Sequence, residues 1–110
     1  MRRDFNQILL NLDGTPARDQ QDKPIMLGFI ATTALLAHNP NDMATAEQKA
    51  KRFQIAVKIN NRPGAVDITA EELSNIKECI GKFYGPLVVG RSFELLELEP
   101  KLVESQPPGG

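Results

Sequence analysis

Tryptophan is absent from this chain of 110 residues, and cysteine and histidine occur once each, as Cys79 and His38. A single cysteine excludes a disulfide within the chain, so the expected location is a reducing compartment, the cytoplasm. Cys79 and His38 are also far apart in the sequence, and neither has a second ligand at metal-binding spacing. The sequence therefore predicts no metal ion and no cofactor.

A long apolar run is lacking as well. The least polar stretch, residues 25–37, contains Gly28 and two threonines, and it is shorter than the roughly 20 residues that span a bilayer. The basic start Met1-Arg2-Arg3 is followed by only a short apolar segment, unlike a secretory signal. We expect neither a membrane partner nor a cleaved leader.

The chain has little net charge. A formal value of -1 excludes a general attraction to nucleic acid or to anionic membranes. The charge is nevertheless uneven, because five cations fall in a stretch without an acid. Such unevenness is typical of solvated faces. These cations are also the candidate nucleic-acid-binding residues of an alternative function: Lys49, Lys51, Arg52, Lys58 and Arg62.

The composition is that of a folded protein, with 41% hydrophobic and 25% charged residues. A chain of this length accommodates one core. We predict a single globular domain over residues 1–98. Residues 99–110, which end in Pro107-Pro108-Gly109-Gly110, are predicted to be a disordered tail.

The first segment reads as a β-hairpin. Residues 5–12 have the alternation of an extended strand, and Asp13-Gly14 follows as a turn signal. A polar loop then leads to Pro24-Ile25-Met26, where we place the returning strand. No internal repeat is visible in the sequence.

Two helices are predicted next. The spacing of Leu27, Ile30 and Leu35 indicates a helix that ends at His38-Asn39-Pro40. A second helix should begin near Asp42 or Thr45, either of which can cap it, and run to about Asn60. Its predicted buried face consists of Ala46, Ala50, Phe53, Val57 and Ile59.

The strongest helix signal lies at Thr69. Its hydroxyl can cap the amide of Glu72 while the Glu72 carboxylate returns to the amide of Thr69, which is a capping box. Ile68 stands where a hydrophobic staple would begin. The helix is predicted to bury one stripe: Leu73, Ile76, Ile80 and Phe83.

Gly85-Pro86 ends this third helix and allows Pro86 to open a fourth, so the two should form a helical hairpin. The fourth helix is apolar on more than one side, and it is either a central core helix or a docking helix. Its candidate protein-binding residues are Leu87, Val88, Val89, Phe93 and Leu96. The predicted fold class is mainly α (α+β), with an N-terminal β-hairpin followed by about four helices.

Residues that could perform catalysis are present but not grouped. Glu71 and Glu72 point about 100° apart on a helix, and Glu72 has a capping role. Ser74, Ser92 and Cys79 have no base placed beside them by the pattern. We therefore predict that the protein is not an enzyme.

The chain resembles a family of small proteins encoded by tailed phages and prophages. The resemblance rests on short segments spread over nearly the whole chain: Asn11-Leu12-Asp13-Gly14-Thr15-Pro16, Lys23-Pro24-Ile25-Met26-Leu27, Asp67-Ile68-Thr69-Ala70-Glu71-Glu72, Ile76-Lys77, Ile80-Gly81-Lys82, Pro86-Leu87-Val88-Val89-Gly90 and Glu94-Leu95-Leu96. Met26 departs from the Ser or Thr expected before the first helix. No functional residue carries over from the family.

What the resemblance implies is a phage context, in which small helical proteins commonly serve particle assembly or regulate the phage programme. We expect a non-enzymatic protein-binding factor in virion morphogenesis, an assembly factor or a tail chaperone-like component. Its partner would be another protein, a phage structural subunit or a further copy of the chain, in the host cytoplasm or associated with the virion. The alternative is a small regulatory protein that binds nucleic acid through the basic second helix.

Overall fold

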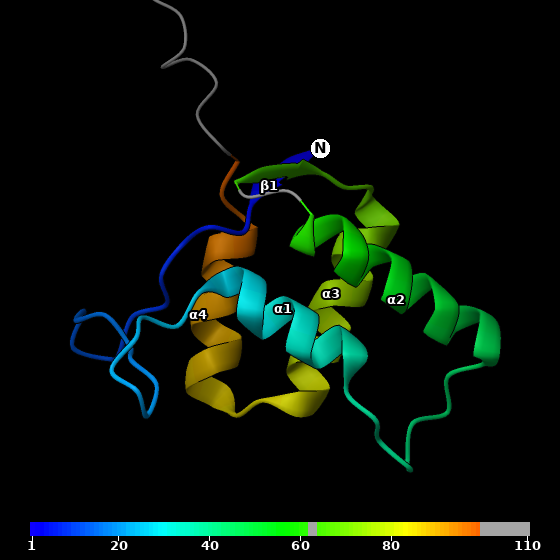
Figure 1. The fold of residues 1–110 in the computed structure, drawn as a ribbon, viewed down its shortest axis with the longest axis horizontal. Helices are drawn as coiled ribbons and strands as arrows, with labels where there is room; N and C mark the ends of the chain where they lie inside the picture. The colour runs from blue at the N-terminus through cyan, green and yellow to red at the C-terminus, as the bar shows by residue number, and fades with distance from the viewer. Residues whose placement is uncertain (62–63, 100–110) are drawn as a thin grey trace, which may run out of the picture.

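A computed structural model describes residues 1–61 and 64–99. Four helices and two short strands follow one another as β1 (Arg2–Asp4), α1 (Leu27–Leu36), α2 (Ala46–Asn60), β2 (Ala65–Asp67), α3 (Ala70–Phe83) and α4 (Pro86–Leu96). The predicted class is confirmed, because the molecule is mainly helical with a small antiparallel sheet (Figure 1). The predicted tail from residue 100 onward lies outside the described residues.

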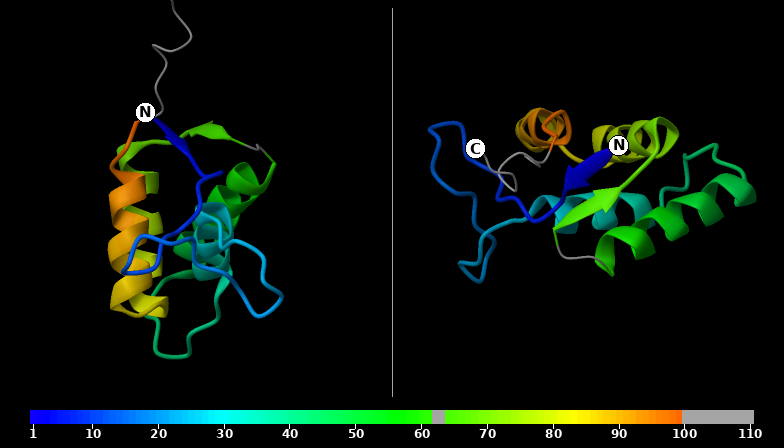
Figure 2. Two further views of the ribbon diagram at one scale, coloured as in Figure 1. Left: turned by 90° about the vertical axis from the view of Figure 1, so that its left-hand side faces the viewer. Right: turned by 90° about the horizontal axis from the view of Figure 1, so that it is seen from above.

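The helices form two layers. α1 and α2 make one layer and α3 and α4 the other, as the view from above shows (Figure 2). Like α3, α1 packs against all three other helices. Its buried residues are those that the periodicity predicts: Leu27, Ile30, Ala31, Ala34 and Leu35.

The ends of the helices follow local signals. Thr45 and Thr69 both form complete capping boxes: the amide of Gln48 lies 3.1 Å from the Thr45 hydroxyl, and that of Glu72 lies 3.0 Å from the Thr69 hydroxyl. Pro86 is the first residue of α4, as predicted, and only Tyr84-Gly85 separates α3 from α4. These ends depend on residues within one helical turn, which is why the sequence alone locates them.

The regular sheet joins two segments that are distant in the sequence. β1 pairs with β2 in antiparallel register, with Arg3 opposite Val66. The arms of the predicted hairpin also meet in antiparallel orientation, but only at an isolated bridge between Ile8 and Met26. Gly28 allows this segment to approach α1, because a Cβ atom there would lie 3.2 Å from the carbonyl oxygen of Phe5.

Between Ile8 and Met26 the backbone repeats one turn conformation, although no repeat is visible in the sequence. The turn at 11–15 and the turn at 19–23 have the same hydrogen bonds: Asn11 N to Thr15 O, Gly14 N to Asn11 O, Asp19 N to Lys23 O and Asp22 N to Asp19 O. Gly14 and Asp22 take the same role, with φ of +88° and +63°. Equivalent positions of the two turns are eight residues apart, but few of them have the same side chain. The repeat is therefore not visible in the sequence.

A ring of backbone hydrogen bonds holds the two turns together. The amide of Leu9 donates to the carbonyl of Ile25, Ile25 donates to Ala17, and Ala17 donates to Leu9, each at 2.9 Å. Each of the three residues thus supplies one donor and one acceptor to the other two. This ring uses backbone groups that a regular hairpin ladder would need, and it explains why the predicted strands are reduced to single bridges.

Two of the predicted buried faces are wrong in part. On α2 the buried side chains are Arg52, Ile55, Ala56 and Ile59, and only Ile59 belongs to the predicted face. On α3 the side chain of Cys79 is buried and Phe83 is 50% exposed. Both helices are rotated relative to the simplest apolar stripe, because the space beside α1 decides which face it covers.

Candidate protein-binding groove

The candidate protein-binding residues of α4 mostly face inward. Leu96 is fully buried, and Val88, Val89 and Phe93 are half-buried against the core. The Phe93 ring is covered further by the ammonium of Lys77, 5.5 Å from its centroid. Leu87, at 44%, is the most exposed of these five residues.

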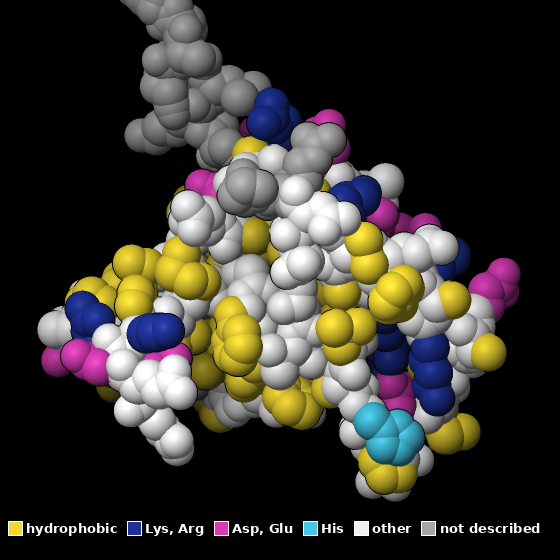
Figure 3. Space-filling model, viewed as in Figure 1, with side chains coloured by type: hydrophobic (Ala, Val, Ile, Leu, Met, Phe, Trp, Pro, Cys, Tyr) yellow, Lys and Arg dark blue, Asp and Glu magenta, His cyan; other side chains and the backbone are white. Residues whose placement is uncertain are grey.

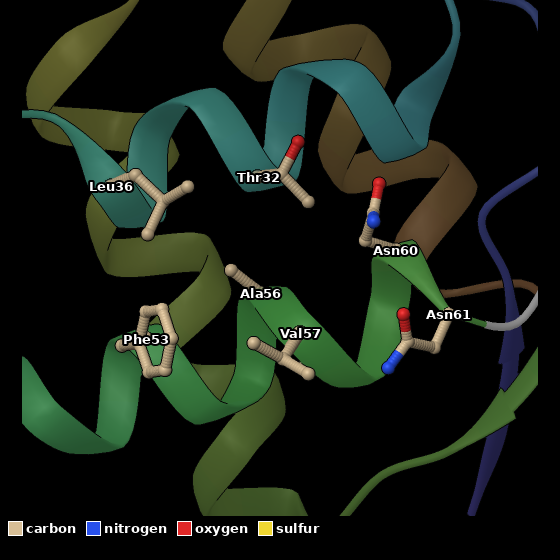
Figure 4. Close-up of a pocket in the computed structure, with 7 residues that line it drawn as sticks. All are labelled: Thr32, Leu36, Phe53, Ala56, Val57, Asn60 and Asn61. Carbon is tan, nitrogen blue, oxygen red and sulfur yellow. The ribbon is translucent and has the colours of Figure 1, made fainter.

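The larger apolar surface lies between α1 and α2. Two adjoining cavities, with volumes of about 320 and 450 Å³, share Thr32 and Asn60 and form one open depression, which we call the α1–α2 groove. Figure 4 shows its first half, where Leu36 of α1 faces Phe53, Ala56 and Val57 of α2. Hydrophobic side chains gather on this face of the molecule over both helices (Figure 3).

Large apolar side chains border the groove without being covered. Phe29 is 63% exposed, Phe53 59%, Leu36 57% and Val57 38%. Ala46 and Ala50 continue the exposed face of α2. Phe53 and Val57, which were predicted to enter the core, therefore border the groove instead. α2 has two apolar sides, and the core uses one of them.

The groove carries no charge. Among the described residues that line its two halves there is no Asp, Glu, Lys, Arg or His. Its polar groups are amides and one hydroxyl, and the hydroxyl of Thr32 is occupied because it donates to the carbonyl of Gly28 at 2.9 Å. The Thr32 methyl group is consequently turned toward the groove (Figure 4). Such a surface suits apolar protein side chains better than a charged small molecule.

Most cations of the predicted basic face pair with acidic side chains of the same molecule. Arg52 is buried and donates to the Asp42 carboxylate at 2.5 Å. Lys58 bonds to Glu72 at 2.8 Å, and Lys51 lies 3.6 Å from Glu71. Lys49 is exposed, and Arg62 lies outside the described residues. The structure thus does not gather the four described cations into one free phosphate-binding surface.

The Asp42–Arg52 pair belongs to the structure of the α1–α2 connection. The hydrogen bond from Arg52, with a smaller contribution from the Ala44 amide, holds the pKa of Asp42 below its ordinary value of 3.8. Lys82 of α3 approaches the same carboxylate at 3.7 Å. Asp42 thus ties the loop before α2 to α2 through Arg52 and to α3 through Lys82. Sequence reasoning missed the Asp42–Arg52 pair because its members are ten residues apart.

The remaining reactive side chains are separate from one another. Burial raises the pKa of the Cys79 thiol, which disfavours the thiolate that a nucleophile requires. His38 is exposed in the loop after α1. Within residues 1–61 and 64–99, no three His, Cys, Asp or Glu side chains gather as metal ligands would.

The described helices include none that is both long and apolar enough to cross a membrane. Comparison of the whole chain with protein-family models, with curated proteins and with solved structures finds no significant match. The fold and the groove therefore define the protein as a small α+β domain with an exposed, uncharged apolar depression.

Proposed function

We propose that this chain is a non-enzymatic phage or prophage protein that binds other proteins in virion morphogenesis, as an assembly factor or a tail chaperone-like component. It would act in the host cytoplasm and could accompany the virion. The phage context is supported by the resemblance of its sequence segments. The protein-binding role is supported by the α1–α2 groove.

The exposure of Phe29, Leu36, Phe53 and Val57 is the observation that carries the proposal. Single exposed apolar residues are ordinary, but a contiguous group around a depression marks an interaction site. Aromatic side chains are also enriched among the residues that dominate protein interfaces. Covering this group removes apolar area from water and supplies the driving force for binding.

Two carboxylates with lowered pKa values, Glu72 and Asp42, have structural partners. Burial alone would raise the pKa of Glu72, but hydrogen bonds from Lys58 and from the Thr69 amide outweigh it and hold that pKa below 4.5. Asp42 is paired with Arg52. These partners support a structural role for both groups, which favours binding over chemistry as the function.

Co-elution with phage head and tail subunits tests the proposal. The full chain is mixed with each purified subunit and passed over a size-exclusion column, and it should co-elute with at least one. Phe53→Glu removes an apolar side chain at the groove, whereas Leu87→Glu does so on α4. Loss of the complex with either variant identifies the binding face, and failure of the unmodified chain with every subunit contradicts the proposal.

The nucleic-acid alternative has less support. Arg52 is buried and Lys58 is paired, so a phosphate contact through the second helix would rest mainly on Lys49 and Lys51. Phosphate binding would show affinity that falls steeply as salt is added. Absence of binding to DNA and RNA at low salt would remove this alternative.

A further inference from the structure

The residues in and around the groove have the spacing of a helix–helix seam. On α2, Ala46, Ala50, Phe53 and Val57 follow one another at intervals of four, three and four residues. On α1, Phe29, Thr32 and Leu36 follow at three and four. Alternating steps of three and four are those of the a and d positions in packed helices, where each side chain enters a hole on a facing helix.

The two stripes belong to an antiparallel helix pair. Leu36 near the end of α1 faces Phe53, whereas Gly28 near its beginning lies beside Ile59 near the end of α2. An antiparallel pair that exposes a stripe on each helix forms one half of a four-helix bundle. The other half must supply two stripes of the same kind.

A second copy of the chain supplies such a half. In a two-fold contact the same patch lies on both sides, so residues near the axis face their own counterparts. Like charges there would repel, but the groove lining described above contains no charged residue. The surface is therefore compatible with its own copy.

The exposed apolar area is of the size that such a contact needs. With about 200 Å² for each phenylalanine, the exposed fractions of 63% and 59% correspond to about 240 Å². Leu36 and Val57 bring the exposed apolar area to about 400 Å². A standard interface buries about 800 Å² on each partner, of which about 450 Å² is apolar.

We infer that the α1–α2 groove is covered by a second copy of this chain, in a two-fold dimer whose four central helices are the α1 and α2 of each copy. The inference rests on the proposed function only in treating the groove as a protein-binding surface. Asn60, which lies at the groove three residues after Val57, then forms a polar position in the seam. Such a position sets the register of packed helices.

The experiment is sedimentation equilibrium of the full chain over a wide concentration range. The unmodified chain should change from the monomer mass to twice that mass as the concentration rises. Phe53→Glu places a charge in the seam and should raise the dissociation constant at least about thirtyfold. Leu12→Glu is the matched control, because Leu12 is 84% exposed in the turn at 11–15, and this variant should dimerise like the unmodified chain.

A second variant keeps the test decisive if Phe53→Glu loses its helical circular dichroism. Ala50→Glu alters an exposed position of the same stripe with a residue that favours helices, and it should weaken the dimer as well. A monomer at every concentration overturns the inference, as does a dimer that both groove variants leave unchanged. A monomeric chain that still co-elutes with a phage subunit overturns the dimer alone, whereas a dimer without any subunit partner overturns the proposed function alone.

Discussion

Within residues 1–61 and 64–99, three polar side chains are buried, and their partners differ. Arg3 and Arg52 donate hydrogen bonds to the Leu96 carbonyl and to the Asp42 carboxylate, respectively. The Ser92 hydroxyl is fully buried and has no hydrogen-bond partner among the described residues. Because a buried polar group is costly only when it is unsatisfied, these residues should respond differently to substitution.

Replacing Asp42 should change how stability depends on pH. The folded pKa of Asp42 is lowered, so its ion pair stabilises the protein above pH 3.8 and the stabilisation is lost as the pH falls through the lower folded value. We expect Asp42→Asn to be less stable than the unmodified chain at neutral pH and to approach it in acid. Urea unfolding at both pH values measures this.

Glu47→Gln is the control for this prediction, since it removes one negative charge from the exposed first turn of α2. It should change the free energy of unfolding less than Asp42→Asn at neutral pH. A difference between Asp42→Asn and the unmodified chain that stays constant down to low pH would contradict the role given to the ion pair.

Removing the hydroxyl of Ser92 should not lower the free energy of unfolding. Ser92→Ala deletes an unsatisfied buried group and places a better helix former in α4, so the free energy of unfolding should stay the same or rise by up to about 1 kcal/mol. Ser92→Val, which adds bulk at a fully buried position, should lower it. Urea titrations of both variants provide the measurement, and a loss of more than about 1 kcal/mol in Ser92→Ala would show that the hydroxyl has a partner.

At the scale of elements, the capping boxes and the rotation of α2 have different origins. The boxes depend on side chains three residues apart, and both form as their sequences indicate. The rotation of α2 depends on α1 and α3, which receive Ile55 and Ile59 in the core and leave Phe53 and Val57 outside. Local chemistry therefore decides where a helix begins, and packing decides which side it buries.

The contribution of the α3 cap to the free energy of unfolding should be measurable by itself. Thr69→Ala removes the acceptor for the Glu72 amide and should lower the free energy of unfolding by about 1 kcal/mol. Thr69→Ser keeps the hydroxyl and should retain most of that free energy. Thermal or urea unfolding followed by circular dichroism distinguishes the two, and equal losses in both variants would argue against the capping bond as the cause.

At the scale of the whole molecule, the fold is closed by contacts between β1 and the end of α4. Arg3 of β1 lies opposite Val66 of β2, and its side chain donates to the carbonyl of Leu96, the last residue of α4. Figures 1 and 2 show β1 beside β2. Phe5, just after β1, belongs to the core as well. The first residues thus hold the sheet and the α3–α4 layer together.

Arg3→Met should show the strength of this closure. It removes a charge-assisted hydrogen bond and leaves the Leu96 carbonyl without its donor, so we expect a loss of about 2 kcal/mol in the free energy of unfolding. Arg2→Met alters the exposed neighbour and should stay within about 0.5 kcal/mol of the unmodified chain. Chemical denaturation compares the two, and equal stabilities would contradict the closing role of Arg3.

By itself the sequence determined the fold class, both ends of α3, the end of α2, the beginning of α4 and the buried face of α1, while it left Asp42 and Thr45 as alternative starts of α2. These features depend on hydroxyl caps, on Gly85-Pro86, and on the apolar stripe of α1, with which few other positions of that helix compete for burial. All of these signals act within a few residues. The apolar stripe through Phe53 and Val57 was recognised as well, but it was assigned to the core, whereas both side chains are exposed.

Only the tertiary structure decided which apolar side of α2 is buried and which side is left exposed. α2 has two apolar sides, and the one containing Ile55 and Ile59 fits beside α1, so the stripe through Phe53 was left open and became the groove. The same packing buried Arg52 against Asp42 and brought β2 to β1. Contacts between residues far apart in the chain carry no local signal, because they depend on how whole elements compete for one core.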